Sequence, residues 1–329
     1  MWQRFVFILA APCLASAQGA LSGPSIGLFF DSHAQGLRRI WGIPGSAMAG
    51  ENLDLGFSVA NATFSSAQDY ALVTAGDGSV NLVRLSETGF AVQPIAALPA
   101  TPDRIIVSPS GQAAAVAYGA SITILTGLPD SVDHVQEIDA SMLPRAPAAI
   151  AISDDGAVLL ASVPDNAETL ASGGVFVFHR GDNGPRLITA NVASDLSFLP
   201  ASHDALVTDE SRNSVTLLAD VGGDASAKWV FMDERLPAPS MAKPSLDGQR
   251  ILVGSTNNSL IALLDRDGGN PVIVSCACSP DRAGALNNLD YQVTDPAKGL
   301  LWILDLSQDP QFFFVPISEA SVASTGASQ

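Results

Sequence analysis

The sequence predicts an all-β fold made of repeated four-stranded antiparallel units, and three observations predict it. Apolar runs of four to eight residues, rich in Val, Ile and Leu, recur along the chain between clusters of turn residues, which is typical of strands rather than helices. Asp-Gly and Ser-Gly pairs, which supply the positive φ angles of tight hairpins, stand between the runs. The third observation is a fixed spacing between similar segments.

Five ten-residue segments align without gaps, and their starts are separated by 43, 45, 46 and 46 residues. They are FSSAQDYALV from Phe64, VSPSGQAAAV from Val107, ISDDGAVLLA from Ile152, FLPASHDALV from Phe198 and PSLDGQRILV from Pro244. Each combines the end of one strand, a polar turn and a second strand, and is followed by another turn and further short strands. Four strands in roughly 45 residues, repeated, describe one blade of a β-propeller.

The two ends of the repeat region predict how many blades the ring contains. The segment IGLFFDSHAQGLRRIWGI, from Ile26, resembles the last two strands of a blade. Near the C-terminus, NNLDYQVTD followed by LLWILDLSQDPQFFFVPI resembles a shortened unit. Five full units, one shortened unit and one hairpin favour seven blades, and a six-bladed ring whose termini share a blade is the alternative. We expect one propeller domain over residues 18–317.

The first residues read as a secretory signal peptide over residues 1–17. Arg4 supplies a positive charge, FVFILAAPCLA a short apolar region, and Ala15 and Ala17 an A-x-A cleavage site. The alternative is an apolar first strand. No later run approaches the ~20 apolar residues of a membrane-spanning helix. We therefore expect an extracytoplasmic protein without a transmembrane segment, ending in a disordered tail over residues 318–329.

Composition limits the classes of partner. Acidic residues outnumber basic ones 33 to 16, which gives a net charge of -17, and no Lys/Arg cluster stands out in the sequence. Such a chain repels phosphate backbones and anionic membrane surfaces, so no nucleic-acid partner is expected. Apolar residues make up 47% of the chain, enough for a substantial core. We expect a monomer.

Two cysteines, Cys276 and Cys278 in VSCACSPD, remain if the signal peptide with Cys13 is removed. An exported chain with one close pair predicts a disulfide, but two positions along an extended strand lie near the upper limit of bridging distance. Two free buried thiols are the alternative. Zinc is not expected, because no His or second Cys pair accompanies them.

The turns SPSG, SDDG and SLDG, each followed by an apolar strand, resemble those of bacterial WD40-like and YVTN-type propeller repeats. The resemblance covers about residues 26 to 317. The Trp-Asp and Gly-His pairs of eukaryotic WD40 repeats and a Tyr-Val-Thr-Asn tetrad are absent, although ALVTA and ALVTD are similar to the latter. The resemblance implies a propeller, and within this class some members resemble lactonases or quinoprotein subunits while others only bind.

Short motifs offer little chemistry. Ser240 and Lys243 have the S-x-x-K spacing but lie in a Pro-rich connector. DRDGGN, residues 265–270, resembles the start of a calcium loop without its distal acid and also suits a hairpin tip, as does SDD at 153–155. Three tryptophans fit packing between blades better than a ligand groove: Trp41, Trp229 and Trp302. The histidines lack metal-ligand spacing: His33, His134, His179 and His203.

These observations favour a binding or scaffold module for a protein, peptide or glycan, without cofactor or metal, over an enzyme. The alternative is a lactonase-type hydrolase with a divalent cation in the central channel. Long loops at one end of the ring are the expected binding surface. Their acids predict a cationic or hydroxyl-rich partner, or serve solubility only: Glu51, Asp130, Asp133, Glu137, Asp139, Asp165, Glu168, Asp233 and Glu234.

Overall fold

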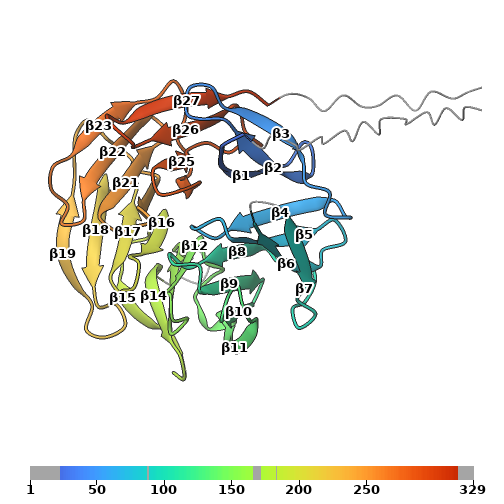
Figure 1. The fold of residues 1–329 in the computed structure, drawn as a ribbon. Helices are drawn as coiled ribbons and strands as arrows, with labels where there is room; N and C mark the ends of the chain where they lie inside the picture. The colour runs from blue at the N-terminus through green and yellow to red at the C-terminus, as the bar shows by residue number, and fades with distance from the viewer. Residues whose placement is uncertain (1–22, 87–88, 166–171, 183, 318–329) are drawn as a thin grey trace, which may run out of the picture.

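The computed structural model describes residues 23–86, 89–165, 172–182 and 184–317, which form seven antiparallel sheets. The sheets follow one another around a ring as the blades of a propeller (Figure 1). The predicted all-β fold and the preferred seven blades are thereby confirmed. The predicted signal peptide, residues 1–17, and the predicted tail, residues 318–329, lie outside the described residues.

Six blades have four strands and the N-terminal blade has three among the described residues. The innermost strands are β4 (Val59–Phe64), β8 (Arg104–Val107), β12 (Ala149–Ile152), β16 (Asp195–Phe198), β20 (Met241–Pro244) and β24 (Gly284–Ala285). The second strands are β1 (Ser25–Asp31), β5 (Tyr70–Ala75), β9 (Ala113–Tyr118), β13 (Val158–Val163), β17 (Ala205–Asp209), β21 (Arg250–Ser255) and β25 (Asp290–Gln292). The third strands are β2 (Gly36–Trp41), β6 (Val80–Leu85), β10 (Ser121–Thr126), β14 (Gly174–His179), β18 (Ser214–Ala219), β22 (Leu260–Asp265) and β26 (Leu301–Asp305). The outermost strands are β3 (Met48–Asn52), β7 (Phe90–Pro94), β11 (Asp133–Asp139), β15 (Arg186–Thr189), β19 (Ser226–Phe231), β23 (Val272–Ser275) and β27 (Gln311–Val315).

The N-terminal blade lacks an innermost strand among the described residues. The turn that follows β1 shows that β1 is a second strand. Asp31 at the end of β1 accepts hydrogen bonds from the backbone of His33 and Ala34. Asp209 plays the same part in the turn between β17 and β18, where it accepts from the backbone of Arg212. That turn joins a second strand to a third. The sequence prediction of two strands for this blade was therefore one strand short.

The edge of β1 that an innermost strand would pair with is closed by a side chain from the next blade. The amide oxygen of Gln68 accepts from the N–H of Leu28 at 2.6 Å, and its nitrogen donates to the carbonyls of Leu28 and Ala285, each at 3.1 Å. Asn287 adds a bond from its amide nitrogen to the carbonyl of Ile26 at 3.1 Å. The Gln68 amide thus imitates a peptide group of the strand that is not there.

Gln68 occupies a backbone position that other blades give to glycine. Gly111, Gly156 and Gly248 stand at the matching place of the first turn with φ of 81°, 64° and 65°, and Gln68 has φ 56°. A left-handed conformation costs a residue with a Cβ about 1–2 kcal/mol. The side-chain contacts across three blades offset that cost.

The core consists of seven buried apolar clusters, one at each junction between neighbouring blades. This is why the strands carry hydrophobic residues on both faces. The cluster that closes the ring packs Phe29 and Ile40 of the first blade against Leu301 and Ile303 of the last. All four side chains are fully buried. The closure therefore rests on apolar packing, on the two amides and on a backbone hydrogen bond from the N–H of Ala49 to the carbonyl of Pro316 at 3.1 Å, without a shared sheet.

The described part of the chain holds one short helix, the 3₁₀ turn η1 (Ala140–Met142), capped by the carboxylate of Asp139. It contains no helix of the length and hydropathy that a membrane span requires.

We predict that Gln68→Ala lowers the free energy of unfolding by about 2–3 kcal/mol, because three hydrogen bonds at roughly 1 kcal/mol each are lost. Gln68→Gly should be about 1 kcal/mol less damaging, since glycine relieves the left-handed backbone. Chemical denaturation measures both. Gln249→Ala is the control, because among the described residues the side chain of Gln249 donates only to the carbonyl of Asp247 in its own turn. Equal stability of the Gln68 and Gln249 variants would refute the closing role.

A second prediction concerns Asp290, which lies beside the same junction. Burial raises the pKa of its carboxyl, and the neighbouring charge of Asp305 raises it further against the hydrogen bond from Asn287. Between the unfolded and the folded pKa the folded state holds more protons, so this group reduces stability as pH rises through that interval. Asp290→Asn should therefore gain stability relative to the parent from about pH 4 towards neutrality, as followed by thermal unfolding. Asp54→Asn removes the same charge from an exposed side chain and should show no such trend.

Candidate binding site at the mouth of the central channel

A central channel with a cavity of about 690 Å³ runs along the innermost strands of the blades. Residues of β4, β8, β12, β16, β20 and β24 line it, and Phe30 of β1 contributes where the innermost strand is missing. We call the end at which the innermost strands begin the channel mouth, and the opposite end, where they meet the first turns, the turn end. A cavity of this volume is in the range of small-ligand sites.

Side-chain hydrogen bonds between blades fix the turn end. The hydroxyl of Tyr70 donates to the carbonyl of Gly111 in the next blade at 2.6 Å. The carboxylate of Asp154 accepts from the N–H of Ser110 on one side and of Ala201 on the other, both at 2.7 Å. These polar groups are consumed by the scaffold, so this end offers few donors to a ligand.

The recurring turn acids are also consumed locally. The hydroxyl of Ser153 donates to Asp155 at 2.6 Å, and that of Ser245 donates to Asp247 at 2.5 Å. The Ser245 hydroxyl and the N–H of Gln249 hold the pKa of Asp247 below its usual range. The Ser and Asp residues of the SDD and SLDG motifs therefore stabilise hairpin turns.

The channel mouth gathers basic residues in an otherwise acidic chain. Four of the 16 Lys and Arg residues line the cavity, together with three carboxylates. Three of the cations form ion pairs: Lys243 with Asp195 at 2.7 Å, Arg282 with Asp295 at 2.9 Å and Lys298 with Asp281 at 2.9 Å. The fourth, Arg104, donates to the carbonyl of Ala148 at 2.6 Å and has no carboxylate partner among the described residues. The mouth therefore has one more positive than negative charge.

In each of the three pairs the carboxylate is the more buried partner. The carboxylate side chains are 17–21% exposed, and the cations 32–71%. Backbone donors hold all three carboxylates: Asp195 accepts from the N–H of Ala242, Asp281 from that of Asp295, and Asp295 from that of Ala297. The acids are thus fixed in the wall, while the ammonium and guanidinium groups are presented to solvent.

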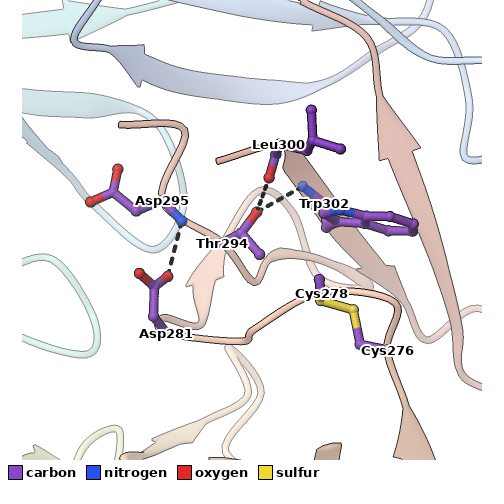
Figure 2. Close-up of a disulfide and its surroundings, with 7 residues drawn as sticks. All are labelled: Cys276, Cys278, Asp281, Thr294, Asp295, Leu300 and Trp302. Atoms are coloured by element: carbon purple, nitrogen blue, oxygen red, sulfur yellow. Dashed lines mark hydrogen bonds between the residues drawn. A yellow bond between two sulfur atoms is a disulfide. The ribbon is translucent and has the colours of Figure 1, made fainter. Parts of the chain in front are cut away.

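A disulfide anchors the connector that brings Asp281 to the mouth. Cys276 and Cys278 are bonded to each other with their Cα atoms 5.0 Å apart, which decides between the two alternatives left open by the sequence. Figure 2 shows the disulfide, followed by the stretch that leads to Asp281 and its bond to Asp295. Cys278 packs on the apolar cluster between the sixth and seventh blades. The disulfide therefore ties the start of this connector to the core.

The acids predicted as a binding surface lie outside the cavity lining. Alternation of strand direction places most of them at the end of the ring that holds the channel mouth, but on outer strands and loops: Glu51, Glu137, Asp139, Asp165, Asp233 and Glu234. Asp130 and Asp133 lie at the other end, at the turn between β10 and β11. Glu168 is outside the described residues. Their binding role stays a prediction. We call the six acids at the mouth end the outer acidic rim.

The remaining motifs have structural explanations. Ser240 donates to the carbonyl of Gly254, while Lys243 pairs with Asp195, so the S-x-x-K residues make no contact with each other. The DRDGGN segment is the hairpin tip between β22 and β23, where Asn270 donates to Asp265 at 2.6 Å.

The tryptophans pack rather than line the channel. Trp302 contacts the ring of Phe314 with centroids 5.9 Å apart, and Trp229 packs on the cluster between the fifth and sixth blades. The guanidinium of Arg39 lies 5.3 Å from the ring centroid of Trp41.

Within residues 23–317, as far as the structure describes them, no three His, Cys, Asp or Glu side chains are grouped as metal ligands. The three carboxylates of the channel are each neutralised by Lys or Arg. The alternative of a hydrolase with a channel cation thus finds no ligand set in the described residues.

Neither protein-family models nor curated proteins gave a match to the chain. Among solved structures, a functionally unknown protein from Desulfotomaculum acetoxidans DSM 771 is similar, with 13% identity, coverage of 89% of this chain and 99% of that chain, and a TM-score of 0.59. Kluyveromyces lactis Hsv2p is similar with 11% identity, coverage of 78% and 97%, and a TM-score of 0.51. At such identities the likeness shows the propeller fold alone.

We predict the thiol content that follows from the disulfide. Denatured protein that has lost residues 1–17 should show no reactive thiol without reductant and two after reduction, because Cys276 and Cys278 are then its only cysteines. A colorimetric thiol assay with an alkylation step measures this. A chain that retains Cys13 should show one and three. Two thiols before reduction in the shortened chain would show that the disulfide is wrong.

Proposed function

We propose that this chain is a binding module of the WD40-like or YVTN-type propeller class, exported by the signal peptide over residues 1–17, which presents its channel mouth to a protein, peptide or glycan. The main support for this proposal is that the two ends of the ring differ in how their polar groups are used. The turn end uses its donors and acceptors to hold the blades together. The mouth end presents exposed cations at the channel and acids around them.

The outer acidic rim gives the module its preference. Glu51, Glu137 and Glu234 are exposed, and their carboxylates make no hydrogen bond or ion pair among the described residues. Free carboxylates on a rigid scaffold attract cationic groups and accept hydrogen bonds from hydroxyls. A partner with lysines or arginines, or a glycan, therefore suits this end, and polyanions are repelled by the net charge.

We predict that the triple variant Glu51→Gln, Glu137→Gln and Glu234→Gln weakens the binding of the partner about tenfold at low salt. Three exposed charges at roughly 0.5 kcal/mol each give about that factor. The measurement is binding of residues 18–329 to arrays of basic peptides and neutral glycans, followed by titration of each captured ligand.

The matched control neutralises three exposed acids at the turn end: Asp130→Asn, Asp133→Asn and Asp182→Asn. This variant should bind as the parent does. Equal weakening by both triple variants would indicate an effect of net charge only, and unchanged, salt-independent binding by the rim variant would exclude the rim as the contact surface.

A further inference from the structure

The channel mouth has a charge opposite to that of the chain as a whole. The protein has 33 acids and 16 bases, yet the cavity is lined by four bases and three acids. The bases come from three blades, with Arg104 on the third, Lys243 on the sixth, and Arg282 and Lys298 on the seventh. The innermost strands of these blades all begin at this end, so the ring brings together residues that are far apart in sequence.

The donors left at the mouth are those of the cations. A guanidinium has five N–H donors and an ammonium three. Arg104 uses one towards the carbonyl of Ala148, and Lys298 uses one towards Asp281. The rest of their donors have no acceptor among the described residues. Asn61, exposed at the start of β4, adds an amide nitrogen with no acceptor among them.

We infer that the channel mouth binds a carboxylate group of the ligand. Carboxylates already occupy this set of cations in the form of Asp195, Asp281 and Asp295, which shows the chemistry that the cations accept. A net charge of one positive unit matches a monoanion. A phosphate dianion would meet three fixed carboxylates with only that single excess charge. A guanidinium without a carboxylate partner, as in Arg104, pairs with a carboxylate in bidentate fashion.

This inference rests on the proposed function and specifies the group that enters the channel. Within the outer acidic rim, a ligand is favoured when it presents a carboxylate to the mouth and cationic or hydroxyl groups to the rim. The cavity of about 690 Å³ accepts a small organic acid or the end of a peptide. Both sources carry the same group, and the experiment separates them.

The test uses residues 18–329 and three probes at constant ionic strength: the monoanion propionate, the peptide acetyl-Ala-Ala-Ala with a free carboxylate, and the same peptide as its amide. Calorimetric titration should show saturable binding of at least one carboxylate probe and none of the amide. Binding of propionate as tight as that of the peptide assigns a small organic acid, and binding of the peptide alone assigns a chain terminus. Both results support the inference.

Two variants locate the site. Arg104→Gln and Lys298→Gln should each weaken binding of the carboxylate probe at least tenfold, because each removes a charged donor from the mouth. Arg250→Gln is the matched control, since Arg250 is exposed at the turn end and donates no hydrogen bond through its side chain among the described residues. Thermal unfolding of all three variants verifies folding. Lys298 is the most exposed of the three paired cations, so its variant disturbs the fold least.

Lack of saturable binding by both carboxylate probes, equal binding by all variants, or saturable binding of inorganic phosphate in place of the carboxylates would overturn the inference. If the rim variant loses binding to an array ligand while neither carboxylate probe binds the parent protein, the carboxylate site is refuted and the proposed function stands. If a carboxylate probe binds while the rim variant binds the array ligands as the parent does, the carboxylate site is supported and the rim is excluded as the contact surface.

Discussion

Closure of the ring is the constraint on which the rest of this structure depends. Many rings of repeats can be closed by a blade that both termini share, but here the first and last blades are separate sheets. Their junction is held by the apolar cluster around Phe29 and Ile303 and by the amides of Gln68 and Asn287. Each amide satisfies backbone groups of β1 that an innermost strand would otherwise pair, and unpaired buried backbone groups are costly. Because every blade packs only on its neighbours, the channel keeps its shape only while this junction holds.

The same junction explains the shape of the channel. Six blades contribute an innermost strand to the wall, and the first blade contributes Phe30, while Gln68 of the second blade lines the wall where the strand is missing. Gln68 adopts a left-handed backbone that the equivalent turns give to glycine. A strained residue that persists needs compensating contacts, and here they bind three blades at once. The presence of glutamine at position 68 is therefore explained by the missing innermost strand and not by the needs of the turn itself.

The blades were predictable from sequence because their causes are local. Apolar runs and positive-φ turn residues recur along the chain, the Ser-x-Asp turn occurs at Ser153 and at Ser245, and each feature acts within a few residues. The channel mouth could not be predicted, because Arg104 and Lys298 are separated by 194 positions and line the same cavity only once the ring has formed. The search for a Lys/Arg cluster along the chain could not find cations that gather in space. A signal existed for the ring closure, because Gln68 stands where three of the aligned turns have glycine.

The positive charges of the channel mouth and the negative charges of the outer acidic rim lie on different parts of the blades. Arg104 and Lys243 lie on innermost strands, and Arg282 and Lys298 lie on connectors before β24 and after β25. The acids of the rim lie on outermost strands and on loops. The three wall carboxylates are buried more deeply than their partners, so they lower the self-repulsion of the cations without covering them. Exposed charges more than about 10 Å apart are largely screened from one another at physiological salt. The mouth can therefore attract an anionic group at short range while the rest of the surface repels polyanions. This separation of charges selects small or dipolar ligands over highly charged polymers, which is a selectivity that net charge alone cannot provide.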